Sequence, residues 1–348
     1  SACLVGSEMC IRDRQNMWEV VPLLGYGIVE QQGTQNPEED ETTCRTLTTE
    51  DLISEELLLP QPEETQQTAL IPESVEATAG TALSNFRPAV QQVQIDRTQL
   101  ADYETLVRNF YAIDANTMAG SDQLSVEKLL GMDMTLPQEG DGPQILIYHT
   151  HSQETFADSD NDPSTSIVGI GRYLTEILNN KYKIPTMHHE GVYDLINGKL
   201  DRSEAYEFAK PEVEQILAEN PSIEVVIDLH RDGVADTTHL VTEINGKPTA
   251  QIMFFNGLSR TRVNGDLAGM ANPYLQDNLA FSLQMKIAAE TKYPGFARRN
   301  YLRGYKYNMD LMPRMLLIEA GAQTNTVEEM RNAMEVLADL LNSVLTGR

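Results

Sequence analysis

The chain has 348 residues, and its 26 lysines and arginines stand against 52 aspartates and glutamates, which gives a formal charge of −26. This charge repels the phosphates of nucleic acids and anionic lipids and argues against binding to either. Hydrophobic residues make up 41% of the chain, enough for a substantial core in one large domain or two. No apolar run approaches the roughly 20 residues that a membrane helix needs.

The N-terminal part of the sequence is unlike a folded domain. Residues 1–14 (SACLVGSEMCIRDR) resemble translated sequencing-adapter strings, and we interpret them as an assembly artefact, so that a natural signal peptide or membrane anchor would be missing from this sequence. Residues 15–95 are rich in Gln, Glu, Thr and Pro, which predicts a disordered acidic linker. The three cysteines all lie in these segments, so they cannot supply a disulfide framework or zinc site to the main domain.

Residues 96–141 form a predicted helical lead-in. Apolar residues recur at helical spacing in its first half: Leu100, Tyr103, Leu106, Val107, Phe110 and Tyr111. A second short helix is expected between Leu124 and Leu130. The turn-forming stretch EGDGPQ then marks the start of a catalytic domain over residues 142–348.

Strand-like and helix-like runs alternate through this domain. Strands are predicted at 144–148, 223–229, 251–255 and 314–318, and helices at 168–180, 212–220 and 275–291. In the C-terminal helix, Thr326 and Glu329 have the spacing of a capping box, and an apolar stripe follows them. The alternation predicts an α/β fold, a mainly parallel twisted sheet flanked by helices.

Polar residues that can bind metals follow three of the predicted strands. HTHSQE follows ILIY, HRD follows VVIDL, and Glu319 follows RMLLI. Open α/β sheets bind ligands at the carboxyl ends of their strands, so these segments are expected to converge. The alternative is a set of hydrogen-bonded polar residues at the rim of the sheet.

The first two segments together predict a zinc site. His151 and Glu154 have the H-x-x-E spacing, by which one short loop presents an imidazole and a carboxylate to the same ion. His230 would complete the His₂Glu set of a catalytic Zn²⁺ site that leaves one position for water.

Glu319 is the candidate catalytic residue. It emerges from an apolar strand rather than from a solvated charge run, and a zinc hydrolase needs a base that accepts a proton from water and returns it to the leaving amine. A structural salt bridge is the competing interpretation.

Other polar residues near these motifs have several candidate roles. His149 could be a hydrogen-bond partner behind the ligands, a substrate contact, or a ligand in place of His151. Asp228 could orient an imidazole, and Arg231 could pair with a substrate carboxylate or with Asp232. The remaining histidines are expected on the surface: His188, His189 and His239.

The motifs ILIYHTHSQETF, VVIDLHRDG and YNMDLMPRMLLIEAGAQTNTVEEM resemble the stage II sporulation protein P family of endospore-forming bacteria. The lead-in stretch NFYAIDANTMAGSDQLSVEKLLGMDM is also similar to the segment that precedes the catalytic domain in that family. The resemblance implies a zinc amidase-like or carboxypeptidase-like fold and an extracytoplasmic, membrane-anchored peptidoglycan hydrolase that acts with sporulation proteins D and M in engulfment.

The implied reaction is zinc-dependent cleavage of the N-acetylmuramoyl-L-alanine amide, with stem-peptide endopeptidase action as a further option. His151 and His230 match the essential histidine motifs of the family, and Glu319 matches its expected catalytic glutamate. Glu154 is less secure as a ligand, because related amidases place their glutamate ligand further along the chain. Arg314 would hold a peptide carboxylate or form an ion pair with Asp310.

Two other functions compete with this interpretation. A zinc carboxypeptidase or deacylase would use the same residues on a different amide, whereas a metal-free scaffold would bind the cell wall without cleaving it. An amidohydrolase barrel is disfavoured, because the roughly 200 residues after Asp141 are few for eight βα units.

Overall fold

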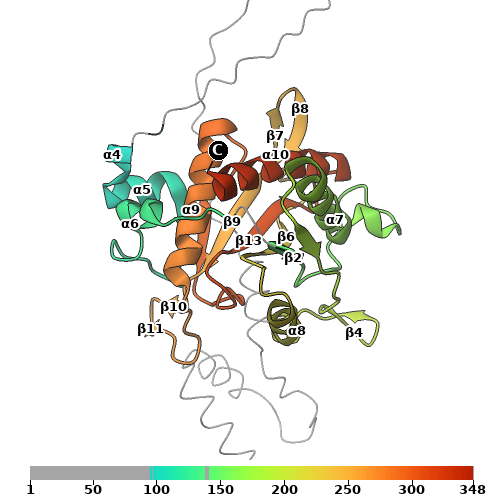
Figure 1. Ribbon diagram of the computed structural model, residues 1–348, viewed down its shortest axis with the longest axis horizontal. Coiled ribbons are helices and arrows are strands. Elements are labelled where there is room, and N and C mark those ends of the chain that lie inside the picture. The colour runs from blue at the N-terminus through green and yellow to red at the C-terminus, as the bar shows by residue number, and fades with distance from the viewer. Residues whose placement is uncertain (1–94, 96, 138–140, 348) are drawn as a thin grey trace, which may run out of the picture.

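The computed structural model describes residues 95, 97–137 and 141–347 (Figure 1). The predicted assembly artefact, and the predicted linker apart from residue 95, lie outside this range. Within the described residues, no helix combines the length and the apolar character that crossing a membrane requires.

The lead-in consists of short helices and one strand. The helices are α4 (Arg97–Leu100), α5 (Tyr103–Phe110) and α6 (Val126–Gly131). The side chain of Asp102 caps α5 by accepting a hydrogen bond from the Thr105 N–H at 2.9 Å. Strand β1 (Tyr111–Ile113), which sequence analysis did not predict, pairs in parallel with β12 (Asn300–Arg303) and adds an edge to the main sheet.

The main sheet has seven strands in the order β1-β12-β9-β13-β6-β2-β3. Its other members are β2 (Ile145–Tyr148), β3 (Thr186–His188), β6 (Val225–Asp232), β9 (Ile252–Gly257) and β13 (Met315–Ala322). The β9–β13 pair is antiparallel, and the other neighbouring strands of this sheet pair in parallel. This arrangement confirms the predicted mainly parallel sheet.

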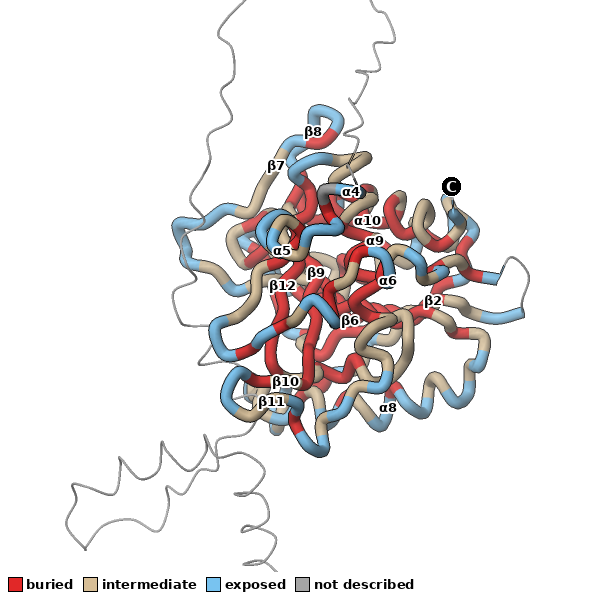
Figure 2. Tube along the Cα trace, turned by 90° about the vertical axis from the view of Figure 1, so that its left-hand side faces the viewer, coloured by how far each residue is buried: buried red, intermediate tan, exposed pale blue. Residues whose placement is uncertain are grey.

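Helices cover both faces of the sheet (Figure 1). The larger apolar cluster joins one face to α7 (Ile167–Ile177), α9 (Leu275–Lys292) and α10 (Val327–Thr346). A smaller cluster joins the other face to α8 (Ala205–Glu219), and we call this the α8 face. Figure 2 shows that the central strands are buried between these layers.

Several short elements lie outside the predicted pattern. They include a 3-10 turn at Pro163–Thr165, a π-helical turn at Leu178–Tyr182, and three hairpins: β4 (Leu195–Ile196) with β5 (Lys199–Leu200), β7 (Val241–Ile244) with β8 (Lys247–Ala250), and β10 (Arg260–Thr261) with β11 (Gly265–Asp266). Helix α8 begins seven residues before its predicted start and contains Pro211.

The predicted capping box at the start of α10 is present. The hydroxyl of Thr326 accepts a hydrogen bond from the Glu329 N–H at 3.2 Å, and Glu329 Oε2 accepts one from the Thr326 N–H at 3.0 Å. The same carboxylate oxygen contacts Asn325 Nδ2 at 2.9 Å and His239 Nε2 at 2.8 Å. Glu329 therefore holds the loop that follows β13 as well as the helix end.

We predict that Glu329→Ala destabilises the protein more than Thr326→Ala does. Loss of the Thr326 side chain removes one cap and is expected to cost about 1 kcal/mol of unfolding free energy. Loss of Glu329 removes three interactions and is expected to cost about 2 kcal/mol or more. Urea denaturation measures both, with the neighbouring exposed Glu328→Ala as a control. Equal losses for the two variants would show that Glu329 acts only as a cap.

Candidate active site

Strand alternation places the predicted residues of two strands on one face of the sheet. On β6, Val226 packs in the cluster on the α8 face, so Asp228 and His230 point to that same face. On β13, Leu317 packs there as well, and Glu319 follows two residues later. Glu319 and His230 are direct neighbours in the register of these parallel strands.

The buried carboxylate of Asp228 connects the loop after β2 to β6. Its two oxygens accept hydrogen bonds from the Thr150 N–H at 2.9 Å and the Thr150 hydroxyl at 2.6 Å. The first of these oxygens also lies 2.8 Å from His230 Nε2. The other ring nitrogen of His230, Nδ1, lies on the side of Glu154.

The two candidate ligand histidines lie side by side. The rings of His151 and His230 have centroids 5.1 Å apart and meet edge to face. Burial lowers the pKa of His151 well below its ordinary value, which keeps that imidazole neutral. Burial also acts to lower the pKa of His230, but the Asp228 carboxylate together with Glu154 and Glu319 outweighs it and raises the pKa to about 9.

Glu154 is buried beside His230. Its Oε2 accepts a hydrogen bond from the Arg231 backbone N–H at 2.8 Å and lies 3.9 Å from His230 Nδ1. Its Oε1 lies 3.5 Å from Arg202 Nη2. Burial raises the pKa of Glu154, although His230 and Arg202 act in the opposite direction.

Glu319 carries a buried carboxylate oxygen, Oε2, that has no hydrogen-bond partner in the described part of the chain. Burial raises its pKa well above the ordinary value, and the nearby carboxylates of Asp232 and Glu154 add to this effect against the influence of His230. A carboxyl group with a raised pKa at a strand end is suited to proton transfer.

A bulge in β13 follows directly after Glu319. Glu319 pairs with His230 but Ala322 pairs with Asp232, so β13 holds one extra residue. Gly321 lies in this bulge with φ of +57°, and a Cβ atom there would lie 2.6 Å from Met330 Sδ. The bulge therefore depends on glycine, and it ends the regular pairing at the candidate site.

The residue types at the site fit zinc, but the side chains are not closed around a metal position. Among the residues that the structure describes, no three His, Cys, Asp or Glu side chains are arranged to hold a metal ion. Two imidazoles and a carboxylate are nevertheless the donors of a catalytic zinc site. His230 also faces Asp228 through one nitrogen and Glu154 through the other, as a ligating histidine with a supporting carboxylate does.

His149 is not part of this group, because it lies one residue after Tyr148 and alternation turns it to the opposite face. Its Nδ1–H donates to the Leu229 carbonyl at 2.7 Å, and its Nε2 lies 2.9 Å from His188 Nε2. The expectation that His188 lies in a surface loop is wrong, since it belongs to β3 and its side chain is 7% exposed. Gly171 of α7 packs closely over both rings.

The other two predicted histidines lie away from the candidate site. His239 is exposed and contacts Glu329, as a surface residue can. His189 is half-buried, with Nε2 2.7 Å from the Tyr193 hydroxyl.

The two predicted arginines have different positions. Arg231 is at the site, but its side chain donates to the backbone carbonyls of Thr155 at 3.0 Å and Asp232 at 3.1 Å, and the Asp232 carboxylate pairs with Arg298 instead. The expected ion pair between Arg314 and Asp310 is wrong, because each of the two residues pairs with other partners.

Arg314 precedes β13 at the opposite end of the sheet and pairs with Glu224 at 2.9 Å. Glu319 lies five residues further along the chain, a distance of about 16 Å in a strand. Asp310 pairs with Lys210 and Lys306.

Three residues at the site were not predicted. Tyr206 of α8 stacks on the His230 ring with centroids 6.5 Å apart and meets the His151 ring at 5.7 Å. Arg202 contacts Glu154, and the buried Asp194 accepts hydrogen bonds from the Ser152 hydroxyl and the Gln153 N–H. Asp194 and Arg202 flank the β4–β5 hairpin and Tyr206 lies in the first turn of α8, and neither segment carries a motif in the sequence.

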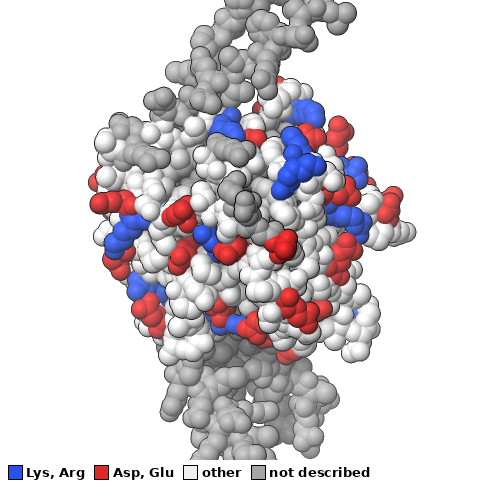
Figure 3. Space-filling view, in the orientation of Figure 1, with Lys and Arg blue, Asp and Glu red and all other residues white. Residues whose placement is uncertain are grey.

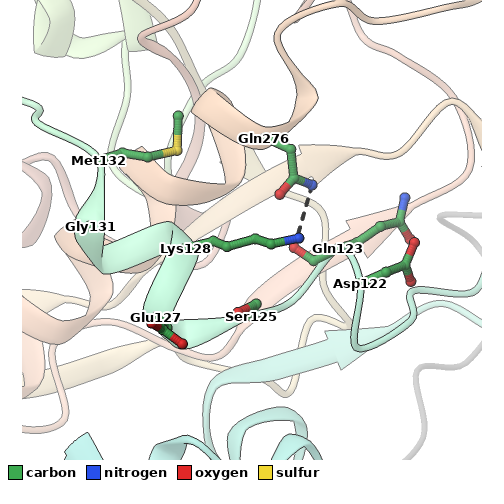
Figure 4. Close-up of a pocket in the computed structure, with 8 residues that line it drawn as sticks. All are labelled: Asp122, Gln123, Ser125, Glu127, Lys128, Gly131, Met132 and Gln276. Carbon is green, nitrogen blue, oxygen red and sulfur yellow. Dashed lines mark hydrogen bonds between the residues drawn. The ribbon is translucent and has the colours of Figure 1, made fainter.

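An open cleft of about 850 Å³ lies elsewhere, beside α6 and the start of α9 (Figure 4). Its lining contains none of the predicted site residues: it consists of Asp122, Gln123, Ser125, Glu127, Lys128, Gly131, Met132 and Gln276. Figure 3 shows acidic and basic side chains interspersed over the described part of the visible face. Neither feature marks a second reactive centre.

We predict that His188 contributes to acid sensitivity. Burial, with Arg172 and His189, lowers its pKa from 6.5 to about 4, so between these pH values the unfolded chain binds more protons than the folded one. The free energy of unfolding therefore falls as pH decreases from 6.5 toward 4. Between pH 7.5 and pH 5, the free energy of unfolding of His188→Gln should fall by about 1–2 kcal/mol less than that of the parent protein. Denaturant titrations at both pH values test this, and equal losses would contradict it.

The family model described as Stage II sporulation protein P matches residues 40–342. Stage II sporulation protein P of Bacillus subtilis (strain 168) is 26% identical over 222 residues, which cover 59% of this chain and 52% of that protein. The chain therefore spans about half the length of this curated relative.

Similar solved structures include amidases from several bacteria. The CwlD amidase of Clostridioides difficile, in complex with the GerS lipoprotein, has a TM-score of 0.38 at 14% identity. The match covers 59% of this chain and 100% of the CwlD chain. AmiC2 of Nostoc punctiforme, an N-acetylmuramoyl-L-alanine amidase, has a TM-score of 0.36 at 10% identity. The match covers 58% of this chain and 97% of the AmiC2 chain. The amidase Ami1 of Mycobacterium smegmatis has a TM-score of 0.35 at 9% identity, covering 60% and 100%.

Proposed function

Since this chain belongs to the stage II sporulation protein P family, we propose that it is a peptidoglycan hydrolase, a zinc-dependent N-acetylmuramoyl-L-alanine amidase that acts in engulfment during endospore formation. One observation carries the chemical part of this proposal. His151, Glu154, His230 and Glu319 come from three segments that are far apart in sequence, yet they gather at the carboxyl ends of β2, β6 and β13.

His151, Glu154 and His230 would hold the zinc ion. When bound, zinc supplies Lewis acidity to the scissile carbonyl and lowers the pKa of water. Asp228 fixes the orientation of His230 through the 2.8 Å contact with Nε2, which leaves Nδ1 for the metal. The Arg231 N–H holds the Glu154 carboxylate in place.

Glu319 would be the proton-transfer residue. It accepts a proton from water as the water oxygen adds to the carbonyl carbon, and it then donates that proton to the leaving amine as the C–N bond breaks. Burial raises the pKa of this carboxyl group, so it holds the proton between the two steps. No covalent bond to the protein is required.

The proposed biological setting follows the family. It comprises peptidoglycan as substrate, sporulation proteins D and M as partners, and an extracytoplasmic location with membrane anchoring in the full-length protein. A partner that binds an amidase has a counterpart in the C. difficile amidase, which was solved in complex with a lipoprotein.

Two isosteric variants separate ligand from base. We predict that the parent chain binds one zinc ion and releases stem peptides from purified sacculi. Glu154→Gln keeps an acceptor for the Arg231 N–H but loses a ligand charge, so zinc stoichiometry and activity should both fall. Glu319→Gln should keep its zinc and lose activity by about 10²–10⁴-fold. Metal content per chain and peptide release are the two measurements.

Glu335→Gln serves as the control, because this carboxylate on α10 is 43% exposed and lies on the opposite side of the sheet. Cleavage of sacculi by metal-free protein would contradict the zinc proposal. Binding to sacculi without any cleavage would favour a scaffold. Release of C-terminal amino acids alone would favour a carboxypeptidase.

A further inference from the structure

Arg202 carries a charge at the candidate site that the protein itself engages only loosely. Its guanidinium lies 3.5 Å from Glu154 Oε1 and 4.0 Å from Asp194 Oδ2, both longer than good hydrogen bonds. Its Nε is buried without a hydrogen-bond partner in the described part of the chain. The side chain is 28% exposed, whereas those of Glu154 and Asp194 are 3% and 0% exposed.

Neighbouring arginines use their donors within the protein. Arg231 donates from Nε and Nη1 to two backbone carbonyls, and Arg298 donates from Nη1 to the Asp232 carboxylate at 2.6 Å. A guanidinium has five N–H donors in a planar fork that matches a carboxylate. Of these three arginines, Arg202 is the one whose fork is available to a ligand.

The position of Arg202 relates it to the reacting atoms. Glu154 lies between the Arg202 guanidinium and His230 Nδ1, so one carboxylate separates the fork from the candidate zinc ligands. An extended peptide advances about 3.5 Å per residue. An anionic group one or two residues from the scissile amide therefore falls within reach of Arg202.

We propose that Arg202 binds a free carboxylate of the peptide substrate and selects peptides that carry one next to the residue released at the scissile amide. This inference rests on the proposed amidase function and names its substrate class. A planar monoanion suits the site better than a phosphate dianion, because it matches the guanidinium fork and adds less negative charge beside the carboxyl groups of Glu154 and Asp194.

The opposing view is that Arg202 only neutralises the buried carboxylates of Glu154 and Asp194. Such a structural role would make Arg202 important for folding but would give no preference between charged and uncharged substrates. The two views therefore differ in substrate discrimination rather than in overall loss of function.

The test uses the Glu319→Gln chain, so that ligands bind without being cleaved. Two synthetic muramoyl peptides differ only in the glutamate that follows the alanine, which carries a free carboxylate in one and a carboxamide in the other. Calorimetry should show at least about 10-fold tighter binding of the carboxylate peptide. Adding Arg202→Gln should remove this preference, and adding Arg202→Lys should retain part of it.

Arg172→Gln is the matched control, because it removes the same charge from α7 on the opposite face of the sheet. The titrations are run with zinc and with chelator, and thermal unfolding verifies that each variant is folded. Equal binding of both peptides, or an equal loss for both in Arg202→Gln, overturns the role of Arg202 while the amidase proposal stands. Failure of both peptides to bind overturns both proposals.

Discussion

The candidate site depends on the buried carboxylate of Asp228. The regular pairing of β2 with β6 ends at Tyr148 and Asp228, and beyond that point the backbone ladder no longer positions the chain. Asp228 positions the chain there by accepting hydrogen bonds from both the N–H and the hydroxyl of Thr150 while it contacts His230. One fully desolvated side chain thus sets the position of the loop that carries His151 and Glu154 and the orientation of the opposing imidazole. Its negative charge is tolerated in the core because these partners hold its pKa below the ordinary value despite burial.

Acidic side chains gather on the same face of the sheet. Glu154 is buried and Glu319 carries a buried carboxylate oxygen. Both have raised pKa values, and the charges that oppose this effect come from His230 and from the arginines at the site. Buried carboxylates are stable as anions only where a cation is close. A divalent cation bound between His151, Glu154 and His230, as we propose, would supply that positive charge. It would also displace the second ring proton from His230.

Sequence reasoning located the strand ends well and the connections poorly. Continuous apolar runs predict buried strands such as 223–229, and the polar residues that follow such strands must lie at one edge of a parallel sheet. The face on which His149 lies could not be predicted, because all four residues of β2 are apolar and buried, so the sequence does not show which of them point to which layer of helices. Strand β1 was missed because three residues hold too little periodicity. Tyr206 and Arg202 were missed because tertiary packing alone brings their connection to the site.

Arg314 and Arg202 show how this limitation affects function. Arg314 was chosen because it lies within a recognisable motif, but a residue that precedes a strand lies at the amino end, and the strand itself then separates it from the chemistry at the carboxyl end. Arg202 belongs to no motif, yet the hairpin between Asp194 and Arg202 returns the chain to the loop that Asp194 already holds through Ser152. In a parallel sheet the strands supply the reactive groups, and the connections that cross their carboxyl ends are free to vary around them. Residues that select the substrate are therefore to be expected on such connections, where sequence patterns are weakest.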